Sequence, residues 1–229
     1  MSAMEWAPEA EPQSREEAQR SPRCPEVVAA AKKRGITNVV HFTTLGGLKG
    51  ILASCAVKSR KDLPTDETVK YVYEPNAVDR NLDRLWHDYV NLSVTAINRR
   101  MFNFSAREHR DTEWVILEFG PEILGDGGVV FSTTNNIYPA AHRCRGLRGF
   151  EQMFAASVPG RYGSPTTRGD HGPHETTDPQ AEVLYPFELP LEHLHRVTVP
   201  DDDVKDAVKA VRSHFRHKPK IKKDPEAFR

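Results

Sequence analysis

Residues 114–121 have the sequence WVILEFGP, and this stretch decides the fold class. Aromatic and β-branched residues that end at a Gly-Pro pair predict a β-strand. Similar apolar runs recur along the chain. They occupy residues 38–42, 89–94, 129–132, 180–185 and 196–199. Because these runs do not alternate regularly with helices, we expect an α+β fold, with a mainly antiparallel β core decorated with helices.

Four segments between or after these strands predict helices. They are residues 25–35, 47–54, 147–156 and 201–215. The first has proline in its first turn and glycine at its end. The last begins with three aspartates, which can cap a helix and complement its dipole, and its apolar residues recur every three or four positions.

The 229 residues suit one domain with short tails. Residues 1–24 are acidic and contain few large apolar side chains, so we expect a disordered N-terminal tail. Residues 25–216 form the expected domain. Residues 217–229 are rich in lysine and predict a basic C-terminal tail, which could either contact phosphates or simply be solvated.

The composition argues against several classes of protein. Three cysteines are too few for a disulfide framework or a zinc knuckle, and we expect no metal site. No apolar run approaches the roughly 20 residues needed to cross a bilayer, so we expect no membrane association and a cytoplasmic location. The formal net charge of zero argues against nonspecific coating of nucleic acid, but not against binding of a few nucleotides.

Glu182 and His41 are the first candidates for chemistry. Glu182 lies in a predicted strand, and His41 and Thr43 end another. Residues two apart on a strand share one face, so His41 and Thr43 point the same way. A carboxylate on one strand that faces a histidine on a second could hold and cleave a ribosyl bond. The alternatives are a surface carboxylate on an edge strand and a half-buried histidine that serves only the core.

Several short motifs follow one another in a distinctive order. They are HFT at 41–43 followed by LKGIL at 48–52, VDRN at 78–81, HDYV at 87–90, FSTTN at 131–135 and QAEVL at 180–184. Together they resemble the DarT family of DNA ADP-ribosyltransferase toxins, small enzymes that move ADP-ribose from NAD onto a DNA base. The resemblance covers roughly residues 36–200. It implies the ADP-ribosyltransferase fold and NAD as a substrate.

The resemblance implies roles for individual residues. Glu182 would be the catalytic carboxylate, because cleavage of the nicotinamide–ribose bond builds positive charge on the sugar, which a carboxylate stabilises. Arg80 would be the active-site arginine and would bind either the NAD phosphates or the reacting base, with Arg84 as the competing candidate. The expected NAD-binding residues are His41, Thr43, Arg80, Tyr89 and Asn91.

Single-stranded DNA is the acceptor that the resemblance implies. Residues 157–179 would be a structureless loop that recognises the acceptor. The expected DNA-binding residues are Asn135, Arg145, Arg148, Arg161, Tyr162, Arg168 and His171. Thymine-modifying members have a longer aromatic and proline-rich run after HDYV, and a histidine at the place of Asn135. This chain continues NLSV instead. These differences put thymine in doubt. The NLS form at 91–93 resembles the branch of the family that modifies guanine, so the resemblance favours guanine over thymine as the modified base.

The resemblance also implies a toxin–antitoxin pair, in which a macrodomain antitoxin removes the modification. Two other interpretations stay open. A protein of the same fold could modify RNA or protein. Alternatively, the basic tail and the arginines at 143, 145 and 148 could make a noncatalytic nucleic-acid-binding module.

Overall fold

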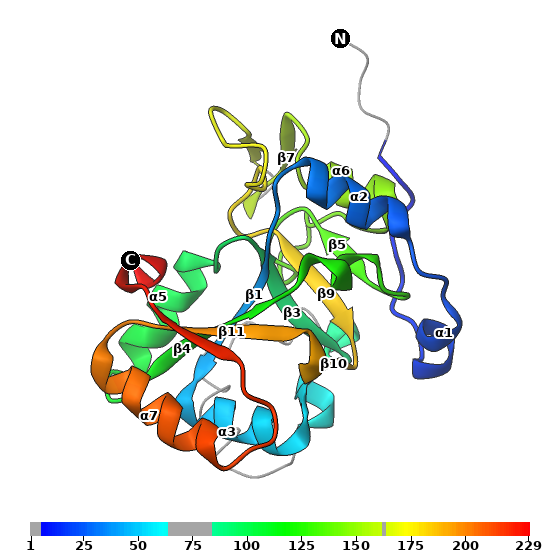
Figure 1. Ribbon diagram of the computed structural model, residues 1–229. Coiled ribbons are helices and arrows are strands. Elements are labelled where there is room, and N and C mark those ends of the chain that lie inside the picture. The colour runs from blue at the N-terminus through cyan, green and yellow to red at the C-terminus, as the bar shows by residue number, and fades with distance from the viewer. Residues whose placement is uncertain (1–5, 64–83, 162–163) are drawn as a thin grey trace.

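An eight-stranded sheet forms the centre of the computed structural model, which describes residues 6–63, 84–161 and 164–229 (Figure 1). Its strands are β1 (Val39–Thr44), β3 (Tyr89–Val94), β4 (Trp114–Phe119), β5 (Val130–Ser132), β6 (Arg143–Arg145), β9 (Glu182–Pro186), β11 (Leu194–Val199) and β12 (Lys220–Lys223). Across the sheet their order is β12-β11-β4-β1-β3-β9-β5-β6. Every neighbouring pair is antiparallel except β11 and β12. The α+β fold with a mainly antiparallel core is confirmed.

Two short strand pairs and six α-helices surround this sheet in the described part of the chain. The pairs are β2 (Ala56–Lys58) with β10 (Glu188–Pro190), and β7 (Ser157–Pro159) with β8 (Pro165–Thr167). The helices are α1 (Arg15–Arg20), α2 (Pro25–Lys33), α3 (Leu45–Ser54), α5 (Arg99–Glu108), α6 (Gly146–Gln152) and α7 (Asp202–Ser213). The short 3-10 turns are η1 (Arg60–Asp62), η4 (Pro121–Gly125), η6 (Leu191–His193) and η7 (Pro225–Phe228).

Local sequence signals explain where the predicted helices begin and end. Pro25 starts α2, and Gly35 follows its end with a φ of +75°, a value that glycine adopts without strain. The side chain of Asp201 accepts a hydrogen bond from the Val204 N–H and caps α7. The helix expected at residues 147–156 is α6, which ends earlier than expected, at Gln152.

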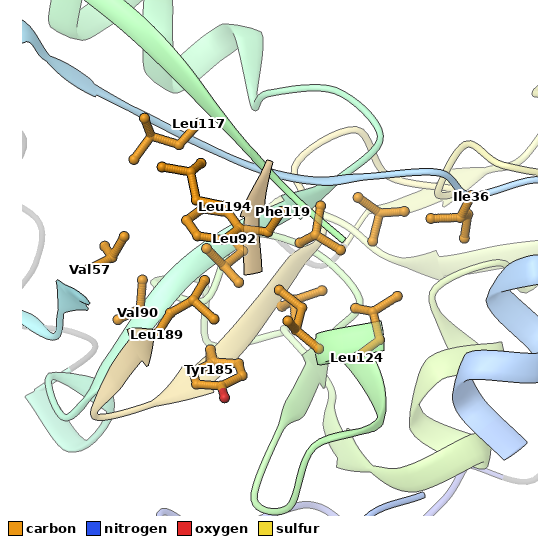
Figure 2. Close-up of a cluster of buried hydrophobic side chains, with 14 of the residues drawn as sticks. Ile36, Val57, Val90, Leu92, Leu117, Phe119, Leu124, Tyr185, Leu189 and Leu194 are labelled. Carbon is orange, nitrogen blue, oxygen red and sulfur yellow. The ribbon is translucent and has the colours of Figure 1, made fainter. Parts of the chain in front are cut away.

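Apolar side chains pack on both faces of the sheet. On one face, α2, α3, α6 and α7 cover the main cluster. Figure 2 shows part of this cluster, including Leu92, Leu117 and Phe119. On the other face, α5 and the C-terminal turn cover a smaller cluster around Phe102 and Trp114 (Figure 1). Each large apolar side chain buried in this way contributes about 1.5–3 kcal/mol to folding. The two clusters hold the central strands rigidly, and these strands carry the candidate site.

The N-terminal segment differs from the disordered tail that the sequence predicted. Its described residues, 6–24, lie along the molecule, where Ala7, Ala10 and Ala18 are buried. The Ala10 N–H donates to the Arg143 carbonyl at the open edge of β6 over 2.6 Å. Low hydrophobicity suggested disorder, but small alanines and backbone hydrogen bonds are enough here because the sheet offers an unpaired edge.

The C-terminal segment also departs from its prediction as a basic tail. Residues 220–223 form β12, which pairs in parallel with β11, and Ile221 packs against the main core cluster. Because lysines flank Ile221, the sequence of β12 looks like a charged tail, and the strand was not predicted. The helix α5 had no prediction, because it buries only Phe102 and Ser105 and its other residues are mostly polar.

Residues 157–179 are not structureless in their described part. They contain the β7–β8 hairpin and then a turn-rich stretch anchored to the residues after α6. No helix among the described residues is long and apolar enough to cross a membrane.

Candidate active site

The sheet splits between β1 and β3. Strand β1 pairs with β4 along its whole length, from Val39 to Thr44. It pairs with β3 only through Val39 and Val40, opposite Val94 and Ser93. From His41 onward the two strands no longer pair, and the His41 side chain lies between them, with its Nδ1 2.9 Å from the Asn91 carbonyl oxygen of β3. Such an opening within a rigid sheet is a well-supported place for a binding site.

A cavity with about 830 Å³ of space, part of it open to solvent, lies at this split. Five residues expected to form the site line it: His41, Thr43, Tyr89, Asn91 and Glu182. They come from three strands, β1, β3 and β9, and only the sheet topology brings them together. The structure therefore places these sequence-predicted residues around one cavity.

Glu182 is buried at the wall of this cavity. It begins β9, a strand between β3 and β5, so it does not lie on an edge strand. The residue is 3% exposed, and its Oε2 accepts hydrogen bonds from Asn91 Nδ2 at 3.1 Å and the Asn136 N–H at 2.8 Å. A carboxylate taken out of water needs such donors. The two bonds hold its orientation before any ligand arrives.

Asn91 connects Glu182 to His41. Its side chain donates to Glu182, and its backbone carbonyl lies 2.9 Å from His41 Nδ1. Thr43, two residues beyond His41 on β1, is buried. A Cβ added at Gly47 would lie 2.2 Å from Thr43 Oγ1, so the glycine lets the start of α3 approach this hydroxyl.

Tyr89 is positioned by the N-terminal segment as well as by the sheet. Its hydroxyl accepts from the Gln13 N–H at 3.1 Å, and its ring lies 5.1 Å from that of Trp86. The guanidinium of Arg145 donates to the Glu11 carbonyl at 2.5 Å and lies 3.5 Å from the same hydroxyl. Arg145, expected to bind DNA, thus makes contacts within the protein.

Two basic residues that the sequence analysis missed also line the cavity. They are Lys58 at the end of β2 and Arg60 in η1, whose Nη1 lies 3.5 Å from His87 Nε2. The predicted active-site arginine, Arg80, lies outside the described residues, and Arg84 is exposed. The sequence around Arg60 looks like an ordinary polar turn, so only the pairing of β2 with β10 reveals its position.

The other residues expected to contact DNA lie in or near the loops after β5 and β7. Asn135 is buried, and its Oδ1 accepts from the Ile137 N–H at 3.1 Å. Arg148 is exposed on α6. The guanidinium of Arg161 lies 5.7 Å from the centre of the Tyr138 ring. Tyr162 lies outside the described residues.

Arg168 and His171 tie their own loop together. Arg168 donates to the carbonyls of Gly172 at 2.5 Å and Glu175 at 2.8 Å. His171 Nδ1 lies 2.9 Å from the Thr176 carbonyl oxygen. Burial and the nearby Arg34 lower the pKa of Arg168. Among the residues that the structure describes, no group of His, Cys, Asp or Glu could hold a metal ion.

Comparison with solved structures shows that DarT proteins have this fold. A Thermus sp. 2.9 DarT in complex with ADP-ribosylated ssDNA matches with a TM-score of 0.62 at 17% identity, over 91% of this chain and 100% of that one. The same protein in complex with NAD+ matches with a TM-score of 0.54 at 18% identity, over 84% and 98%. Thermosipho africanus DarTG in complex with ADP-ribose matches with a TM-score of 0.51 at 12% identity, over 84% and 51%.

A match to a protein-family model identifies the family of this chain. The model described as "ssDNA thymidine ADP-ribosyltransferase, DarT" matches residues 40–229. The match covers well over half of the chain, and the chain belongs to the DarT family. A search of curated proteins finds no match.

Proposed function

We propose that this protein transfers ADP-ribose from NAD to a base of single-stranded DNA, with Glu182 as the catalytic carboxylate. The observation that carries the proposal is the buried Glu182, held by two donors in a cavity where the central sheet splits. Family membership supports it, as do the similar DarT structures in complex with NAD+ and with ADP-ribosylated ssDNA.

The reaction needs what this cavity offers. As the bond between ribose C1′ and nicotinamide breaks, its electron pair leaves with nicotinamide and positive charge develops on the sugar. A carboxylate already oriented in a site of low polarity stabilises that charge without reorganisation. A base nitrogen of DNA then bonds to C1′, and Glu182 can accept the proton that this nitrogen loses.

The cavity residues divide between two parts of NAD, the nicotinamide and ribose on one side and the central diphosphate on the other. His41, Thr43 and Tyr89 supply hydrogen-bonding groups for the ribose and the nicotinamide amide. Lys58 and Arg60 supply positive charge for the two phosphates, beside the predicted Arg80. Asn91 already donates to Glu182, so its part is to orient the carboxylate.

Labelled NAD and single-stranded oligonucleotides test the proposal. Wild-type protein should attach the label to DNA. Glu182→Gln keeps the shape of the side chain but not its charge, so we expect adduct formation to fall by about 10³-fold or more. Glu192→Gln, whose side chain is 77% exposed in η6, is the matched control and should keep full activity. Two outcomes would refute the proposed function. One is a wild-type protein that labels only RNA or protein, and the other is a wild-type protein that binds DNA equally with and without NAD but attaches no label to it.

We infer guanine as the modified base. The stretch NLSV at 91–94 and Asn135 support guanine, whereas the description of the family names thymidine. Oligonucleotides that lack either guanine or thymine distinguish the two bases. Mass spectrometry of the digested nucleosides should detect ADP-ribosylated deoxyguanosine, and an adduct on thymidine alone would overturn the inference.

We also propose that the protein acts as a toxin opposed by a macrodomain antitoxin. Modified bases in a replicating chromosome would stop growth, and a macrodomain hydrolase would restore it by removing ADP-ribose. Induced expression should therefore arrest growth in wild type but not in Glu182→Gln, and coexpression of a macrodomain hydrolase should relieve the arrest. Equal growth of the wild-type and variant strains would contradict this proposal.

A further inference from the structure

A single arginine holds the loop between β5 and β6. Arg143 begins β6, and its side chain is 13% exposed. Its Nε donates to Asn136 Oδ1 at 2.5 Å, and its Nη2 donates to the Asn136 carbonyl at 2.6 Å and lies 3.4 Å from the Tyr138 carbonyl oxygen. Its Nη1 donates to the Ala141 carbonyl at 2.8 Å and to Glu9 Oε1 at 3.1 Å.

These contacts engage all three nitrogen atoms of the Arg143 guanidinium. Arginine has five N–H donors, and the five acceptors around Arg143 match that number. The sequence analysis grouped Arg143 with arginines that could bind phosphate. In the structure, four of its five acceptors belong to the loop, so only the N–H that faces Glu9 could turn to a phosphate while the loop stays in place.

The loop that Arg143 holds reaches Glu182 directly. Among the described residues, the Asn136 N–H donates to Glu182 Oε2 at 2.8 Å, beside Asn91 Nδ2. Arg143 donates hydrogen bonds to both the side-chain oxygen and the backbone carbonyl of Asn136. These bonds fix the position of Asn136, and with it the direction of the Asn136 N–H. A carboxylate that must stabilise charge at one carbon atom depends on such preorganisation.

We propose that Arg143 is a positioning residue for Glu182, which it orients through the loop of residues 136–141. The proposal rests on the proposed function, in which Glu182 is the catalytic carboxylate. Arg143 contacts neither NAD nor DNA in this role. Its loss should therefore slow the chemical step without weakening the binding of either substrate.

Two substitutions separate positioning from phosphate binding. Arg143→Lys keeps the positive charge, but an ammonium group cannot reach acceptors spread along a planar fork. Arg143→Met removes both the charge and the donors. We expect both variants to lower kcat by about 100-fold, the order expected for a misplacement near 1 Å, with unchanged KM for the oligonucleotide and unchanged NAD affinity by calorimetry. Arg20→Lys, at a side chain 75% exposed on α1, should match wild type.

A second readout needs no DNA. Slow hydrolysis of NAD, in which water bonds to C1′ instead of a base, should fall in parallel with DNA modification, because the defect lies at Glu182. Should both Arg143 variants fail to fold, Asn136→Ala removes one acceptor of Arg143 but keeps the N–H that Glu182 uses. It should lower kcat by about fivefold, the equivalent of one neutral hydrogen bond.

The outcomes are distinct. Normal kcat in Arg143→Lys, together with a raised KM for the oligonucleotide in Arg143→Met, would overturn the inference and assign Arg143 to DNA. Normal kcat in Asn136→Ala would also overturn it. If wild type is active and Glu182→Gln is not, these failures concern Arg143 alone. If wild type itself is inactive on every acceptor, the proposed function fails and the inference fails with it.

Discussion

Glu118, on the central strand β4, is a carboxylate taken almost fully out of water. It is 6% exposed, and it accepts hydrogen bonds from Arg196 Nε at 2.9 Å, from the Thr198 hydroxyl and from Asn38 Nδ2 at 3.3 Å. Burial acts to raise its pKa. The hydrogen bonds from Arg196 and Thr198 and the charge of Arg196 outweigh burial, so the net pKa lies below the ordinary value of 4.5.

This lowered pKa predicts acid sensitivity. The unfolded carboxyl titrates near 4.5, so the stabilisation by Glu118 is complete above that pH and is lost as the pH falls through the lower folded pKa. Glu118→Gln should lower the free energy of unfolding at pH 7 by about 2 kcal/mol, typical of hydrogen bonds to a charged group. Urea unfolding between pH 3 and 7 measures both effects. A variant whose stability declines with acid as steeply as that of wild type would contradict this account, and Glu192→Gln serves as the control.

At the scale of one element, the start of α3 lies next to the candidate cavity, so a change in this helix can affect both stability and binding. Thr44 caps it by accepting from the Gly47 N–H at 2.9 Å, and Thr43 lines the cavity. Two glycines in the helix differ sharply in their surroundings. A Cβ at Gly50 would meet nothing within 4 Å, whereas a Cβ at Gly47 would meet the Thr43 hydroxyl at 2.2 Å.

The two glycines therefore predict opposite results. Gly50→Ala should stabilise the protein by about 0.5–1 kcal/mol, because alanine loses less conformational freedom in a helix. Gly47→Ala should force Thr43 to rotate and should weaken NAD binding by about tenfold, or 1.4 kcal/mol. Calorimetric unfolding and NAD titration of both variants provide the measurement. Equal NAD affinities in the two variants would show that Thr43 does not contact NAD.

At the scale of the whole molecule, the N-terminal segment covers one edge of the sheet and the side of the cavity that carries Tyr89. Ala10 packs in a cluster with Trp86 and Tyr89, and Gln13 donates to the Tyr89 hydroxyl. This segment precedes residue 40, where the family match begins. We propose that it belongs to the folded unit of this protein.

Deletion of residues 1–24 tests the domain boundary. Loss of these contacts should lower the free energy of unfolding by about 2 kcal/mol, which corresponds to a fall in Tm of roughly 4–8 °C for a protein of this size. Differential scanning calorimetry of the full chain and the truncated chain measures the change. An unchanged Tm would restore the boundary at residue 25 that the sequence alone predicted.

The sequence by itself determined six of the eight strands of the large sheet and five residues that line the candidate cavity. Strands 89–94 and 114–119 were predicted with the bounds that the structure shows. Residues 114–119 are mostly apolar and end at a Gly-Pro pair, and in residues 89–94 the polar Asn91 and Ser93 alternate with apolar side chains. Glu182 and His41 stood out because they end or begin apolar runs and lie in ordered motifs. These signals are local, since strand periodicity and capping depend on residues close together in the chain.

Only the tertiary structure decided how the site is assembled. The donors to Glu182 lie 46 and 91 residues away in sequence, and no local pattern pairs them. The split between β1 and β3, the place of Arg60 in the cavity and the grip of Arg143 on its loop all depend on which strands become neighbours. The same holds for Arg168, whose charge suggested DNA but whose hydrogen bonds serve its own loop. A side chain's type limits what it can bind, but its partners follow from the topology of the sheet.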